Sequence, residues 1–202
     1  MKRIIFFIAL TTSVTVYGQN LGLGVRLGDP SGLSLKKYFG DKAFEISFGR
    51  TYMFNDRYWY VHHFNDWYEE HKFDYNEIQY IGYKASVPLG IQMHYLFQKG
   101  FNKIEDEDLA GLKWYFGFGG QLRFQNYSYD FRYKLKGDPD WHYDENHQVR
   151  EFDFGGDGVI GLEYTFKNAP ISIFADVVLF MEIIDNPFLF YGQGGIGCRY
   201  NF

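Results

Sequence analysis

The C-terminal stretch, residues 188–202, alternates between two kinds of side chain. Counting back from Phe202 in steps of two gives mostly aromatic, aliphatic or small residues, among them Tyr200 and Ile196. The intervening positions include Arg199 and Gln193. A period of two predicts a β-strand with one apolar and one polar face.

The same alternation recurs along the chain and predicts seven further strands. Pro88 lies inside one of them, and because proline removes a ladder hydrogen bond we predict a bulge there. Eight is an even number, as closed antiparallel barrels need when both ends lie on one side. We therefore predict an all-β fold, an eight-stranded antiparallel up-and-down transmembrane β-barrel. The seven other predicted strands are residues 20–28, 33–39, 43–54, 78–97, 113–127, 150–166 and 171–183.

The segments between the strands differ in length on the two sides of the predicted barrel. With both termini on the periplasmic side, the external connections are residues 29–32, 55–77, 128–149 and 184–187. The periplasmic ones are residues 40–42, 98–112 and 167–170. Two long external segments fit the outer-membrane pattern. Helical signals are nearly absent, and only residues 104–112 could form a turn or two of helix.

The polar faces decide between a membrane barrel and a soluble one. They are rich in Gly, Ser and Gln, and their charges are balanced, which predicts a narrow lumen packed with compensating ion pairs and no wide pore. A soluble barrel would place its apolar face inward instead. The predicted lumen ion-pair network comprises Arg26, Lys36, Glu45, Lys84, Lys113, Arg123, Asp153, Asp157, Glu163, Asp176, Glu182 and Arg199.

The N-terminus and the composition indicate export. Lys2 and Arg3 precede a short apolar run and then small residues, as in a secretory signal peptide cleaved near Gly18. We predict two segments, a signal peptide at 1–18 and a barrel domain at 19–202. Aromatic residues make up 22% of the chain, which suits aromatic girdles, and a formal net charge of −5 argues against a nucleic-acid partner. The single Cys198 excludes an internal disulfide.

The end of the chain carries a more specific resemblance. Gly197, Tyr200 and the terminal Phe202 resemble the C-terminal assembly signal of outer-membrane barrels. With the signal peptide, strand number and loop asymmetry, the chain resembles the small outer-membrane β-barrel superfamily of the OmpA transmembrane domain, OmpX and OmpW. The resemblance implies the cell outer membrane as location, with outer-membrane lipid and the barrel-assembly machinery as partners.

Candidate ligand-binding residues cluster in the two long external segments. The first holds three histidines, His62, His63 and His71, which are weak candidates for a transition-metal site because their spacing is not diagnostic. The second holds Asp138, Asp140, Asp144 and Glu145, which could take calcium, but an acidic solvated loop is favoured. We therefore predict no metal and no cofactor.

The first segment is also dense in aromatic residues. We interpret these residues as part of an aromatic girdle with a β-hairpin that extends past the membrane. The alternative is an exposed platform for an extracellular ligand of unknown identity. The residues are Tyr58, Trp59, Tyr60, Trp67 and Tyr68.

No catalytic residues are predicted. Inward-facing Ser86 and His94 are eight residues apart, about 25 Å of strand, too far to form a nucleophile–base pair. The sequence thus favours a non-enzymatic protein with a structural or surface-interaction role through its two long external loops. The alternatives are a lipid A-modifying enzyme of the outer membrane and a small-solute channel.

Overall fold

The computed structural model describes residues 20–52, 57–71, 73–101, 110–184 and 187–202. Eight strands form a closed ring in which each pairs antiparallel with its neighbours, and β6 and β7 complete the ring next to β5 and β8. The ring strands are β1 (Leu21–Gly28), β2 (Ser31–Phe39), β3 (Lys42–Arg50), β5 (Leu89–Gly100), β6 (Leu112–Leu135), β7 (His142–Thr165), β8 (Ile171–Glu182) and β9 (Phe190–Asn201). The predicted eight-stranded antiparallel barrel is confirmed.

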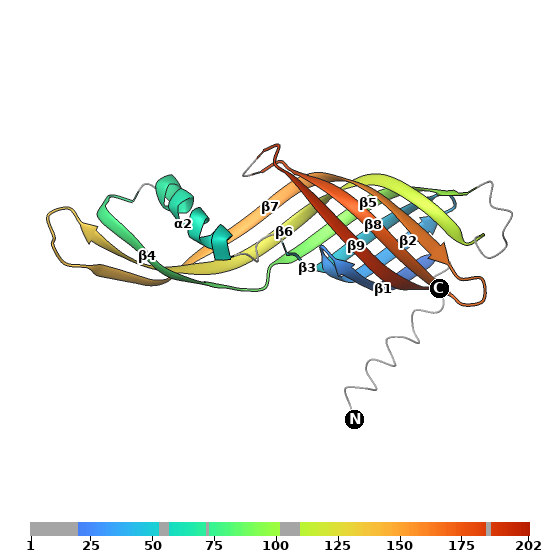
Figure 1. Cartoon of the computed structure of the whole chain (residues 1–202), viewed down its shortest axis with the longest axis horizontal. Coiled ribbons are helices and arrows are strands. Elements are labelled where there is room, and N and C mark those ends of the chain that lie inside the picture. Colours follow the sequence, from blue (N-terminus) through green and yellow to red (C-terminus); the bar gives the residue numbers. More distant parts are fainter. Residues whose placement is uncertain (1–19, 53–56, 72, 102–109, 185–186) are drawn as a thin grey trace, which may run out of the picture.

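Two of the ring strands continue far beyond the barrel. β6 and β7 have 24 residues each, whereas β8 and β9 have 12. At about 3.3 Å per residue, 24 residues cover roughly 80 Å, about twice the path of a tilted strand through a bilayer. The excess length, with β4 (Tyr75–Ala85) and α2 (Arg57–His71), forms an arm at the end of the barrel away from the C-terminus (Figure 1).

The distribution of side chains across the barrel wall is inverted relative to a soluble protein. Leu23, Phe48 and Phe118 point outward and are 45%, 46% and 62% exposed. Arg26 and Arg123 point inward and are 1% exposed. An apolar exterior around an ionised interior is stable where the exterior meets hydrocarbon rather than water. The chain is therefore a transmembrane β-barrel.

The predicted strand over residues 78–97 is two strands. β4 ends at Ala85 and β5 begins at Leu89, on either side of Pro88. β6 remains the partner on both sides of the break, but its register shifts by one residue, from Ala85 opposite Tyr127 to Leu89 opposite Phe124. β3 pairs with β5 and not with β4, so β4 lies outside the ring. One extra residue on the β4–β5 side of the ladder is what a β-bulge inserts, so the irregularity predicted at Pro88 is confirmed.

The two long external segments are not the loops that the sequence led us to expect. Residues 57–71 form α2, in a segment where we predicted no helix, and most of residues 128–149 belong to β6 and β7. The short helix expected within 104–112 and the predicted signal peptide lie largely or wholly outside the described residues. Among the residues that the structure describes, α2 included, no helix has the length and apolar character needed to cross a bilayer.

Candidate functional site

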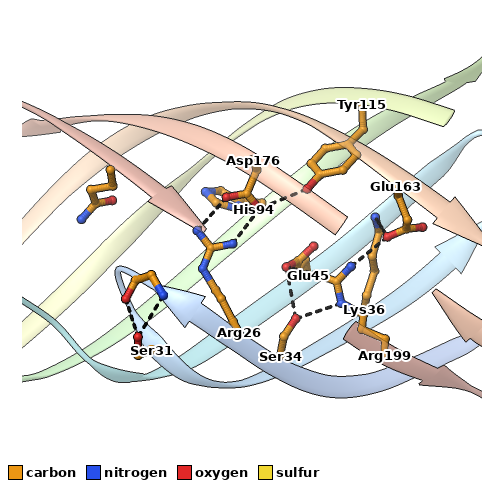
Figure 2. Close-up of polar contacts among 12 residues, drawn as sticks. Arg26, Ser31, Ser34, Lys36, Glu45, His94, Tyr115, Glu163, Asp176 and Arg199 are labelled. Carbon is orange, nitrogen blue, oxygen red and sulfur yellow. Dashed lines mark hydrogen bonds and ion pairs between the residues drawn. The ribbon is translucent and has the colours of Figure 1, made fainter. Parts of the chain in front are cut away.

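In the half of the lumen nearer the C-terminus, the polar contacts are centred on Glu163 and Arg199 (Figure 2). Glu163 accepts hydrogen bonds from Lys36 Nζ and from Arg199 Nη1, both at 2.8 Å. Arg199 also forms an ion pair with Glu45, and its Nε donates to Ser34 Oγ at 3.0 Å. Since all four ionised side chains are at most 3% exposed, each needs these partners to be tolerated away from water.

A second cluster joins β1 to β8. Arg26 donates from both terminal nitrogens to the two carboxylate oxygens of Asp176, at 2.6 and 2.7 Å, and the Tyr115 hydroxyl donates to the same carboxylate at 3.0 Å. The inward position Gly195 makes room for this pair, because a Cβ there would lie 2.3 Å from the Arg26 guanidinium carbon. Tyr115, Asp176 and Arg26 thus connect β6, β8 and β1, and the cluster crosses the narrow interior of the barrel.

Nearer the arm, the lumen holds mixed polar contacts. His94 Nε2 lies 3.0 Å from Asp157, whose carboxylate also accepts a hydrogen bond from Gln121 at 2.8 Å. Arg123 lies opposite Asp153 in the β6–β7 register and packs its guanidinium 4.2 Å from the centre of the Phe180 ring. Glu182 on β8, the last carboxylate of the predicted lumen network, is 2% exposed.

Two members of the predicted network are not buried in the lumen. Lys84 belongs to β4 in the arm, where its side chain is 70% exposed and lies 3.3 Å from Asp130. Its placement in the lumen was wrong, because the one-residue shift in register between β4 and β5 turns Lys84 to the outer face, opposite Ser128. Lys113 is exposed and lines the mouth of the barrel at the end that holds the C-terminus, together with Tyr38 and Phe202.

The arm has an aromatic core of its own, separate from the lumen. Tyr60, Phe64 and Trp67 of α2 are 2–4% exposed and pack on the sheet of β4, β6 and β7. Their spacing, i, i+4, i+7, places them on one face of the helix. The sheet contributes the alternating side chains of β6, namely Tyr127, Tyr129, Phe131 and Tyr133. Tyr60 and Trp67 are thus neither girdle residues nor an exposed platform; Tyr68 is half-buried at the edge of the same core.

The helix also covers inward-facing residues at the outer end of the lumen. Gln125 Nε2 donates to the Tyr60 hydroxyl, and His63 Nε2 lies 3.0 Å from Glu151, opposite Gln125 in the β6–β7 register. Burial raises the pKa of Tyr60 to about 12. The arm is therefore tied both to its own sheet and to the rim of the barrel.

The three candidate histidines diverge. His71 Nδ1 donates to the Trp67 carbonyl at 2.8 Å and stacks against Phe73, His63 faces Glu151, and His62 is exposed. In the acidic segment Asp138 pairs with His142 and Asp144 pairs with His147, each at 2.9 Å. Within the described ranges, no three His, Cys, Asp or Glu residues come together as a metal site would require.

The Ser86 and His94 side chains also lie apart. Ser86 Oγ donates to the Asn126 carbonyl at 2.8 Å in the arm, whereas His94 is in the lumen next to Asp157. Ser86 does not face inward as predicted, because it lies in the break between β4 and β5.

The outer face of the arm, opposite α2, is polar and charged. Arg132 donates to Gln79 at 2.7 Å and Lys134 to Glu77 at 3.1 Å, and both cations lie over Trp141. Closer to the barrel, Asp130 accepts a hydrogen bond from the backbone N–H of Asn146 at 2.7 Å, and this donor, with Lys84, lowers the pKa of Asp130. The sequence reasoning missed this face because it treated the whole segment as a loop.

Comparison with known proteins places the fold. No family model matches the sequence, and no curated protein is detectably similar to it. The N-terminal β-barrel domain of Pseudomonas aeruginosa OprF superposes with a TM-score of 0.50 at 15% identity, over 92% of this chain and 99% of that domain. The fold is that of a small outer-membrane β-barrel.

Two further solved structures are similar at lower scores. Ail, the attachment invasion locus protein of Yersinia pestis, has a TM-score of 0.46 at 11% identity, over 90% of this chain and 93% of its own. Neisserial surface protein A has a TM-score of 0.41 at 10% identity, over 90% and 94%. The resemblance predicted from the sequence is confirmed at the level of the barrel fold.

Proposed function

We propose that this protein resides in the outer membrane as a non-enzymatic barrel that presents a folded arm to the cell exterior as a surface-interaction module. The single observation that carries the proposal is the aromatic core shared by α2, β4, β6 and β7 outside the barrel. A connection with its own buried core is held in one conformation, which lowers the entropy cost of binding a partner.

The side of the membrane that the arm faces is inferred from the position of the C-terminus. The backbone N–H of Asn20 donates to the Phe202 carbonyl at 3.1 Å, so the residue before β1 and the C-terminus lie together at the barrel end opposite the arm (Figure 1). If the termini are periplasmic, as in the superfamily that the sequence resembles, the arm is extracellular.

Surface labelling tests this orientation. In a Cys198→Ala background, Glu145→Cys places a thiol on the exposed part of the arm, and Asn168→Cys places one in the turn before β8. We expect a membrane-impermeant maleimide to label Glu145→Cys in intact cells, and Asn168→Cys only after the outer membrane is opened. The reverse pattern would refute the extracellular arm.

The non-enzymatic part of the proposal has an independent test. The described residues provide no pairing of Ser86 with His94, and each already has another partner. We expect lipid A from a deletion strain to have the same acylation pattern as lipid A from the parent. A changed pattern that is restored by the wild-type gene but not by His94→Ala would establish the enzyme alternative.

A further inference from the structure

A polar hollow of about 360 Å³ lies where the arm meets the barrel wall. Six of its lining side chains are Lys84, Ser86, Asn126, Ser128, Gln148 and Arg150. It belongs to the outer face of the arm, because Lys84 pairs with Ser128, Ser128 with Gln148, and Asn126 with Arg150 across the three strands. Directly paired residues share one face of a sheet.

The hollow continues the lipid-facing surface of the barrel. On β6, Asn126 lies two residues beyond Phe124, about 7 Å along the strand, and on β7 Arg150 lies two residues before Phe152. Phe124 and Phe152 are 40% and 46% exposed, and their rings are 5.2 Å apart. The exterior therefore changes from aromatic to polar at one level, which is the position of the membrane–water interface.

The chemistry of the hollow favours an anion that carries hydroxyl groups. Its lining contains two cations and several hydroxyl and amide groups, and no carboxylate among the lining residues that the structure describes. Arg150 is exposed and forms no ion pair with any described residue. Lys84 contacts Asp130, which lies above the hollow and is also bound by the Asn146 N–H. Arginine and lysine are suited to phosphate, and amides and serines to sugar hydroxyls.

We infer that this hollow binds the phosphorylated sugar headgroup of a membrane glycolipid, whose acyl chains lie against Phe124 and Phe152. β4 and β7 flank β6, so Lys84 and Arg150 stand on either side of a strip about 10 Å wide. The adjoining apolar surface favours a lipid over a free phosphorylated sugar, because only an amphiphile contacts both levels. The inference adds a lipid ligand to the proposed function and rests on the arm being outside the barrel, not on which side of the membrane it faces.

Native mass spectrometry of the detergent-purified full-length protein tests the inference. The probes are bisphosphorylated lipid A, the same lipid without phosphates, and phosphatidylglycerol. We expect one tightly bound lipid A, with affinity reduced about tenfold or more in the double variant Lys84→Gln/Arg150→Gln and similarly for the dephosphorylated probe. Lys136→Gln, an exposed lysine of the same arm paired with Asp74, is the matched control and should bind as wild type.

Three outcomes would overturn the inference. The double variant could bind lipid A as tightly as the wild type, although heat-modifiable gel mobility shows that its barrel is folded. Millimolar inorganic phosphate or glucosamine phosphate could displace the lipid, which would assign the hollow to soluble anions. Phosphatidylglycerol could bind as tightly as lipid A, which would show that the sugar contributes nothing. Because all of these measurements are made in detergent, they are independent of the surface-labelling result.

Discussion

Glu163 is the side chain on which the lumen network depends most. It is 2% exposed, and it neutralises both Lys36 and Arg199 at 2.8 Å. We expect Glu163→Gln to lower the free energy of unfolding by about 3–5 kcal/mol, because it leaves two buried cations with one fewer counter-charge. Urea unfolding in lipid vesicles, followed by heat-modifiable mobility, measures the loss. The matched control Glu145→Gln removes an exposed carboxylate and should change stability by less than about 0.5 kcal/mol.

Phe64 is the side chain on which the aromatic core of the arm depends most. It is 2% exposed and contacts the rings of Trp67, Tyr129 and Phe131. We expect Phe64→Ala to destabilise the arm by about 3–5 kcal/mol through the cavity it leaves. Limited proteolysis should then cut the arm while the barrel keeps its folded gel mobility. Val61→Ala, on the exposed side of the same helix, should remain resistant. Loss of barrel mobility in Phe64→Ala would contradict the independence of the two cores.

The arm should also respond to alkaline pH. Burial raises the pKa of Tyr60 to about 12 and also raises the pKa values of Tyr127 and Tyr129 above the usual tyrosine value of about 10. A raised folded-state pKa means that the stabilisation is complete below about pH 10 and is lost as pH rises through the folded-state pKa.

Tyrosinate absorbance at 295 nm and near-ultraviolet circular dichroism test this together. We expect Tyr60 to ionise near pH 12, well above the exposed tyrosines, and the aromatic dichroism to collapse as the buried tyrosines ionise, while the barrel keeps its far-ultraviolet signal. Titration of all the tyrosines of the protein in one step near pH 10 would contradict the buried cluster.

The sequence predicted the barrel strands well because each has to present a strict apolar/polar alternation to lipid and lumen. That constraint fails in the arm, where both sides of the sheet meet protein or water. The helix left a readable trace, since Tyr60, Phe64 and Trp67 follow a helical period. The many polar and aromatic residues around them obscured it.

The misplacement of Lys84 has a related cause. Alternation assigns inward and outward faces along a strand, but a one-residue shift in register, as at Pro88, exchanges the two faces. Lys84 keeps its polar character at a position where the chain has already left the barrel ring for the arm. Register depends on contacts distant in sequence, here with Ser128, which a local pattern does not contain.

The ring of strands and the arm use separate sets of hydrogen bonds. The ring pairings involve residues 21–50, 89–126 and 150–201, whereas the arm pairings lie within 75–85 and 127–149. We expect a barrel in which residues 53–86 and 127–149 are each replaced by a short Asn-Gly turn to fold and to show heat-modifiable mobility. Failure to fold, with wild type folding in parallel, would show that the arm is needed for barrel assembly.

The same shortened barrel tests which of two features prevents ions from passing through the barrel. One is the arm, since Tyr60 and His63 contact inward-facing residues at the outer end of the lumen. The other is the lumen itself, where the clusters around Arg199 and Arg26 cross the barrel interior with all their ionised groups paired. Because an eight-stranded barrel has just enough interior for its own side chains, the second reason is sufficient. We therefore expect no steady single-channel conductance in planar bilayers from either the full chain or the shortened barrel. Conductance in the shortened barrel alone would make the arm a plug, and conductance in both would establish the solute-channel alternative.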